Sequence, residues 1–96
     1  MSFEDAVSSM NADTFRVEKQ SREESLSDCV RDALNSYFNQ LDGHSASDLY
    51  QLVMEEVERP MFKTVMEHTN GNQTRAAAVL GISRSTLRKK LAHYDI

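Results

Sequence analysis

The residues best suited to chemistry are cations gathered near the C-terminus, in the stretch GNQTRAAAVLGISRSTLRKKL, residues 71–91. A guanidinium group can donate paired hydrogen bonds to a guanine edge or a phosphate, and an ammonium binds phosphate as a point charge. The stretch has the pattern of two short helices joined by a turn, which predicts a helix-turn-helix for DNA. The residues that we expect to contact DNA are Asn72, Gln73, Thr74, Arg75, Ser83, Arg84, Thr86, Arg88, Lys89 and Lys90.

The spacing of the small and apolar residues supports this pair of helices. Ala76, Ala77 and Leu80 fall at i, i+1 and i+4, which gives the first helix a compact apolar face. Gly81 supplies the left-handed residue that ends a helix, and Ser83 has a side chain that can cap the next one. Two leucines one turn apart in the second helix would face back onto the alanines: Leu87 and Leu91.

Position along these helices suggests separate roles for the polar residues. Arg84 lies in the first turn of the second helix, the part that enters the major groove, so we expect it to read a base. Thr86 and Lys89 can reach phosphates or base edges, and Arg88 and Lys90 suit the flanking backbone. Residues 72–75 lie at the N-terminus of the first helix, where free N–H groups attract phosphate.

The net charge is distributed unevenly along the chain. Over all 96 residues it is −4, which is unusual for a DNA-binding protein. Residues 1–70 hold six Lys and Arg against fourteen Asp and Glu, a net charge of −8, whereas residues 71–96 hold five against one, a net charge of +4. The positive surface is therefore local, as phosphate attraction requires.

Several other classes of protein are disfavoured by the composition. Cys29 is the single cysteine, which excludes an intrachain disulfide and suits a reducing compartment. There is no nucleophile–base pair, no glycine-rich phosphate loop and no metal-ligand spacing, so we expect no catalytic residues, no metal and no cofactor. The carboxylates of Glu55, Glu56 and Glu58 are interpreted as a solvated helix face. Without a membrane-length apolar run or a signal peptide, a cytoplasmic location is expected.

The rest of the chain predicts two further helices and an arm. Ser25 begins a capping pattern, and apolar residues then recur at helical spacing until Asp42 and Gly43. Ser47 or Asp48 should cap a second helix of about 30 Å that kinks at its proline and runs to about residue 69. We divide the chain into an arm, 1–24, dimerisation helices, 25–70, and a helix-turn-helix, 71–96. The arm is expected to be mobile, with a weak hairpin around residues 15–17 as the alternative.

The apolar stripes on these two helices are too broad for a chain of this length to cover, which favours a core shared between two subunits. The expected fold is therefore all-α, with four helices per subunit and an intertwined homodimeric core. The residues expected in that core are Leu26, Val30, Leu34, Tyr37, Phe38, Leu41, Leu49, Val53, Val57, Met61 and Val65.

The same segments resemble a known family. GNQTRAAAVLGISRSTLRKKL is similar to the C-terminal end of Fis, the factor for inversion stimulation, a family of bacterial nucleoid proteins. LNSYFNQLDGHSASDLYQLVMEEVERPMFKTVMEHTNGN is similar to the dimerisation helices of that family, so the match runs from about Leu26 to Tyr94. The first two dozen residues look unlike the family. Three positions also depart from its pattern: Ser83, where asparagine is preferred, and Ala92 and His93, where basic residues are common.

The resemblance implies a homodimer that binds and bends double-stranded DNA, organises the nucleoid and regulates transcription, with RNA polymerase or a site-specific recombinase as a further partner. In the family, DNA is contacted at positions matching seven of the residues above: Asn72, Thr74, Arg75, Arg84, Thr86, Lys89 and Lys90. An N-terminal hairpin touches the recombinase, and counting back from the matched helices puts Phe15, Lys19 and Ser21 near its tip.

Two alternatives stay open. The last third also resembles the C-terminal helix-turn-helix of sigma-54-dependent activators, which carry an ATPase domain ahead of it. The initial methionine and the absence of a phosphate-binding loop favour the stand-alone protein. The other alternative is a helical interaction module whose basic helix meets an acidic protein partner.

Overall fold

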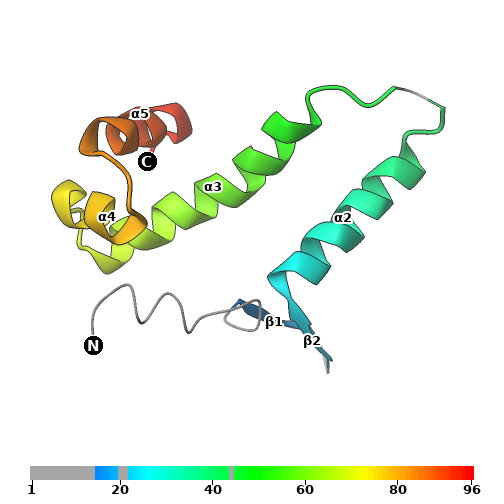
Figure 1. Cartoon of the computed structure of the whole chain (residues 1–96), viewed down its shortest axis with the longest axis horizontal. Coiled ribbons are helices and arrows are strands. Elements are labelled where there is room, and N and C mark those ends of the chain that lie inside the picture. The colour runs from blue at the N-terminus through cyan, green and yellow to red at the C-terminus, as the bar shows by residue number, and fades with distance from the viewer. Residues whose placement is uncertain (1–14, 20–21, 44) are drawn as a thin grey trace. The chain divides into compact units, whose positions relative to one another are not determined.

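The computed structural model describes residues 15–19, 22–43 and 45–96 (Figure 1). The chain divides into two units, residues 1–46 and 47–96, each of which is described by itself. The described residues form a short hairpin and four helices, which confirms the predicted all-α class with four helices. The expected mobility of residues 1–14 concerns a segment outside the described residues. No helix in the described part of the chain is long and apolar enough to cross a membrane.

The first unit begins with a two-stranded hairpin. Strands β1 (Arg16–Lys19) and β2 (Arg22–Ser25) pair antiparallel, with Arg16 opposite Ser25 and Lys19 opposite Arg22. The structure therefore shows the hairpin alternative, although it extends past residues 15–17. The N–H of Leu26 donates to the carbonyl of Phe15 at 2.8 Å. Phe15 thus lies at the base of the hairpin, so its predicted place near the tip is wrong, because Lys19 and Arg22 form the pair farthest from that base. Ser21, which was also expected near the tip, lies outside the described residues.

Helix α2 (Leu26–Gln40) follows β2 directly. The Oγ of Ser25 accepts a hydrogen bond from the N–H of Asp28 at 3.1 Å, which confirms the predicted cap. Along α2, all of which the structure describes, no residue is buried. Leu26 is 41% exposed and Phe38 51% exposed, so part of the apolar stripe of this helix is accessible.

Helix α3 (Leu49–His68) opens the second unit. Asp48 occupies the N-cap position but has a left-handed backbone, with φ 56°, and its side chain makes no capping hydrogen bond, so the predicted capping role of Asp48 is not realised. The helix continues through Pro60, as expected from the periodicity on both sides. Along α3, which is described throughout, Phe62 is the one buried residue.

The two short helices pack against α3. Helices α4 (Gln73–Leu80) and α5 (Arg84–Tyr94) confirm the predicted helix pair (Figure 1). The second unit has a small apolar core, in which Leu87 is fully buried. Helix α3 contributes one buried residue to this core, α4 contributes two and α5 contributes three: Phe62, Ala76, Ala77, Leu87, Leu91 and Tyr94.

Candidate nucleic-acid interface

Helix α4 ends in a left-handed glycine, and two backbone hydrogen bonds close its last turn. At the end of α4, Gly81 has φ 74°, its N–H donates to Ala78 at 3.2 Å, and the N–H of Ile82 donates to Ala77 at 3.1 Å. This pair of bonds satisfies carbonyls that a helix terminus would leave free. Ile82 packs against the apolar core, as the turn requires.

Side-chain caps start both short helices. The Oδ1 of Asn72 accepts from the N–H of Arg75 at 3.1 Å, and the Oγ of Ser83 accepts from the N–H of Thr86 at 3.1 Å. The hydroxyl of Ser83 also donates to the Oγ1 of Thr86 at 2.9 Å. Asn72 and Ser83, both expected to contact DNA, therefore already serve to start a helix.

The apolar and polar faces of α5 are well separated. Leu87 and Leu91 are buried against the alanines of α4, as predicted. The polar residues predicted to bind DNA lie on α4 and α5 or at the N-caps of these helices. Eight of them are exposed, and two are half-buried, Gln73 and Lys90. Those exposed are Asn72, Thr74, Arg75, Ser83, Arg84, Thr86, Arg88 and Lys89.

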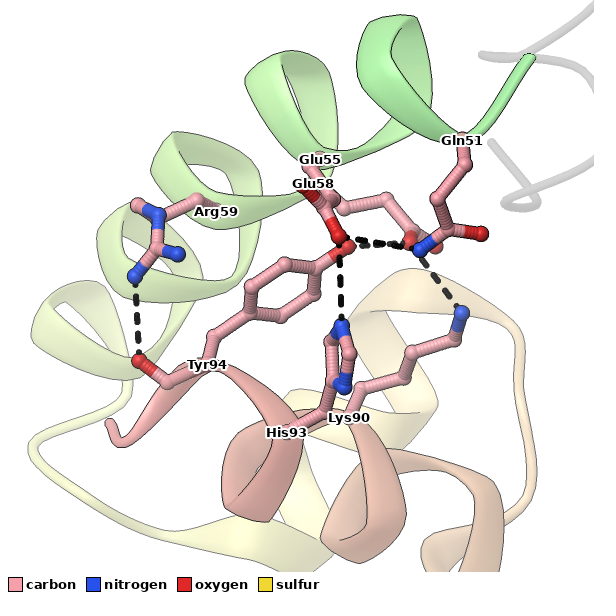
Figure 2. A network of polar contacts seen from close by, with 7 residues as sticks. All are labelled: Gln51, Glu55, Glu58, Arg59, Lys90, His93 and Tyr94. Carbon is pink, nitrogen blue, oxygen red and sulfur yellow. Dashed lines mark hydrogen bonds and ion pairs between the residues drawn. The ribbon is translucent and has the colours of Figure 1, made fainter. Parts of the chain in front are cut away.

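Lys90 differs from its neighbours because its ammonium is held by the protein. Its Nζ lies 3.1 Å from the Oε1 of Glu58 on α3, in an ion pair whose carboxylate side chain is 12% exposed (Figure 2). The interpretation of Glu58 as part of a solvated helix face is therefore wrong. Glu58 faces α5 because Tyr94 and Lys90 approach it from that helix.

Tyr94 shares the same carboxylate. Its hydroxyl donates to the Oε1 of Glu58 at 2.7 Å. This hydrogen bond, followed by the one from Lys90, holds the pKa of the Glu58 carboxyl below its ordinary value. Burial and then the hydrogen bond to Glu58 raise the pKa of Tyr94 to about 12, because both penalise the phenolate.

Two more side chains of α3 hold the ring and the carbonyl of Tyr94. The Phe62 ring stacks on it, with centroids 6.3 Å apart. The Nη1 of Arg59 donates to the carbonyl of Tyr94 at 3.2 Å, and the guanidinium carbon lies 5.2 Å from the centre of the ring (Figure 2). Residues 58–62 of α3 therefore bind the last turn of α5.

The contact of Glu58 and Phe62 with Tyr94 was not predicted from the sequence. Glu58 and Phe62 are one helical turn apart, a signal that was available, but their partners on α5 lie more than thirty residues away. His93, one of the departures from the family pattern, lies with its Nε2 3.7 Å from Glu55. Among the described residues, no group of three His, Cys, Asp or Glu is placed to hold a metal ion.

The residues expected in a dimer core are half-buried or exposed within one chain. On α3, Met61 is 39% exposed and the other expected members are half-buried. On α2 and at its C-cap, Leu41, the exposed members are Leu26 and Phe38, and the others are half-buried. Both helices thus keep accessible apolar surface along the predicted stripes.

Comparisons with known proteins agree with this architecture. The family described as bacterial regulatory protein, Fis family, matches residues 53–94, which span most of α3 together with α4 and α5. The family described as DNA-binding protein Fis N-terminal domain matches residues 1–46. The second match corrects the expectation that the first two dozen residues are unlike the family.

Individual relatives match over most of their length. The chain is 49% identical over 96 residues to DNA-binding protein Fis of Enterobacter sp. (strain 638), covering 98% of each chain. The same figures hold for DNA-binding protein Fis of Pectobacterium carotovorum. DNA-binding protein Fis of Actinobacillus succinogenes is 58% identical over 71 residues, covering 74% of this chain and 72% of that protein.

Proposed function

The chain belongs to the Fis family, and from that premise we propose that it is a homodimeric protein that binds and bends double-stranded DNA. The observation that carries the proposal is the cationic surface of the α4–α5 unit. Its arginines and Lys89 are exposed, while the apolar side of the same two helices is buried in the core. A rigid helix pair with one basic face is the arrangement that places side chains in a major groove.

The proposed roles follow from position on the two helices. Arg84, in the first turn of α5, reads a base edge, and Thr86 and Lys89 lie close enough to assist it or to bind phosphate. Arg88 contacts the flanking backbone. Arg75, in the first turn of α4, binds phosphate together with the polar residues at that helix start.

Dimerisation is supported by the accessible apolar surface that remains along the stripes of α2 and α3. A helix without a buried residue, such as α2, needs tertiary packing to be stable in water. A second copy of the chain would cover both stripes symmetrically and give two recognition helices. By family membership, we propose roles in nucleoid organisation and transcription regulation in the cytoplasm, and in site-specific recombination, with RNA polymerase or a recombinase as partner.

Titration of a 30-base-pair mixed-sequence duplex at salt concentrations from 50 to 200 mM tests the DNA binding. With three phosphate-binding cations per subunit, Arg75, Arg88 and Lys89, the logarithm of the affinity should fall with the logarithm of the salt concentration with a slope of about −5. Arg88→Gln should make the slope shallower by about 1.8 for the dimer. The matched control is Arg31→Gln, which removes an exposed arginine from α2 and should leave the slope unchanged.

The outcome also separates the alternatives. Absence of binding, or a slope near zero, would contradict the proposal and favour a helical module for acidic protein partners. Equal effects of Arg88→Gln and Arg31→Gln would show that attraction to DNA is spread over the whole chain rather than placed on α5.

A further inference from the structure

The last turn of α5 is attached to α3 through Tyr94. Three side chains of α3, Glu58, Arg59 and Phe62, contact Tyr94 in the last turn of α5. Tyr94 is only 3% exposed, and its hydroxyl, its ring and its carbonyl are all engaged. The C-terminal end of α5 is thereby fixed to the long helix by two hydrogen bonds, which Figure 2 shows, and by the stacking of the Phe62 and Tyr94 rings.

Helix α3 carries both the apolar stripe and the residues that contact Tyr94. Residues 49, 53, 57, 61 and 65 form the accessible apolar stripe, and Glu58 and Phe62 lie beside it on the helix surface. If the stripe meets a second copy, α3 connects the dimer contact directly with the recognition helix. Any change in how Tyr94 sits on α3 then changes the orientation of both recognition helices, and with it the path of DNA that spans them.

Glu58 has a second effect, which acts through charge. Lys90 follows Lys89 in sequence, but Lys89 is exposed while the Lys90 ammonium lies 3.1 Å from a carboxylate that is 12% exposed. An ion pair with a mostly buried partner is weakly screened by salt. The carboxylate therefore competes with a DNA phosphate for the same ammonium group.

We propose that Glu58 is a positioning residue for DNA recognition, which locks the last turn of α5 to α3 through Tyr94 and holds the Lys90 ammonium on the protein in competition with phosphate. This inference rests on the proposed DNA-binding function. Glu58, which lies outside the helix-turn-helix, then controls both the orientation of α5 and the number of cations that reach the DNA.

The charge effect is tested with the full-length chain and the mixed-sequence duplex. Glu58→Gln frees Lys90 to bind phosphate, so the salt slope should become steeper by about 0.9 per subunit. For a dimer, the fourfold range from 50 to 200 mM salt then costs about 12-fold more affinity than in the unmodified protein. The matched control is Glu56→Gln, which removes an exposed carboxylate from the same helix. The double variant Glu58→Gln with Lys90→Gln should return the slope to its original value.

The positioning effect is tested with Tyr94→Phe. This substitution keeps the ring against Phe62 but removes the hydroxyl that donates to Glu58, and it leaves the ion pair with Lys90 in place. On a duplex selected by the unmodified protein from a random pool, the bend angle from circular-permutation mobility should change. The salt slope should stay the same. Helical circular dichroism of each variant shows that the fold is retained.

The outcomes separate this inference from the proposed function. If the unmodified protein does not bind the duplex, both are wrong. If it binds with a steep slope but Glu58→Gln and Glu56→Gln give equal slopes, Glu58 does not compete for Lys90. If Tyr94→Phe is folded and bends DNA to the same angle as the unmodified protein, the hydroxyl–carboxylate contact does not position α5. Should Glu58→Gln not fold, the Tyr94→Phe result alone decides the positioning claim.

Discussion

The core of the second unit should depend strongly on Leu87. Its side chain is fully buried between the helices of the pair, so Leu87→Ala removes three carbon groups from the interior. At about 0.8 kcal/mol per group, the lost transfer free energy is about 2.4 kcal/mol, and the residual cavity brings the expected total to about 2–5 kcal/mol per subunit. For a chain of this length, 2.4 kcal/mol corresponds to a fall of roughly 10–20 °C in Tm.

Thermal unfolding followed by circular dichroism measures this effect. The matched control is Val79→Ala, because Val79 lies on α4 but is 57% exposed, and its loss should change the free energy of unfolding by less than about 0.5 kcal/mol. Well below its own Tm, the Leu87→Ala protein should still bind DNA, since no exposed cation is altered. Equal Tm values for the two variants would refute the assignment of Leu87 to the core that holds the helix pair.

Four further outcomes are expected. If the partly exposed stripes of α2 and α3 form a dimer core, Tm should rise with protein concentration, and a folded monomer in sedimentation at micromolar concentration would contradict dimerisation. Arg84→Ala should cost about 1–3 kcal/mol at a selected site but little on mixed sequence, whereas Arg75→Ala should weaken both alike; equal loss of specificity in the two variants would refute this division. In circular-permutation assays the selected site should be bent if the two α5 helices of the proposed dimer lie closer together than successive major grooves of straight DNA, which are about 34 Å apart, because a rigid dimer then fills both grooves only on curved DNA; straight DNA in the complex would contradict the proposed bending. Since the pKa of Tyr94 is raised from 10.0 to about 12, the folded chain keeps a proton that the unfolded chain loses; stability should therefore be intact below pH 10 and fall between pH 10 and 12, and Tyr94→Phe should flatten that fall if the assignment is right.

The local features of the chain were predictable because they depend on residues only a few positions apart. Ser25, Asn72 and Ser83 each cap the helix that follows through a hydrogen bond to a backbone N–H three residues on. Gly81 ends α4 in a left-handed conformation that costs other residues more. Asp48 is an exception, because its side chain is of a capping type but its backbone is left-handed and it makes no capping hydrogen bond.

The sequence by itself determined four helices, their approximate bounds, the helix pair near the C-terminus and the basic charge on it, because periodicity, caps and charge are written in neighbouring residues. It did not show that Glu58 faces Tyr94 and Lys90, or that Phe62 belongs to the core of the helix pair rather than to a stripe. Those contacts join residues 32 and 36 positions apart, and only the packing of α5 on α3 brings them together. Tertiary structure therefore turned one of several similar surface glutamates into the half-buried acceptor that binds the last turn of α5.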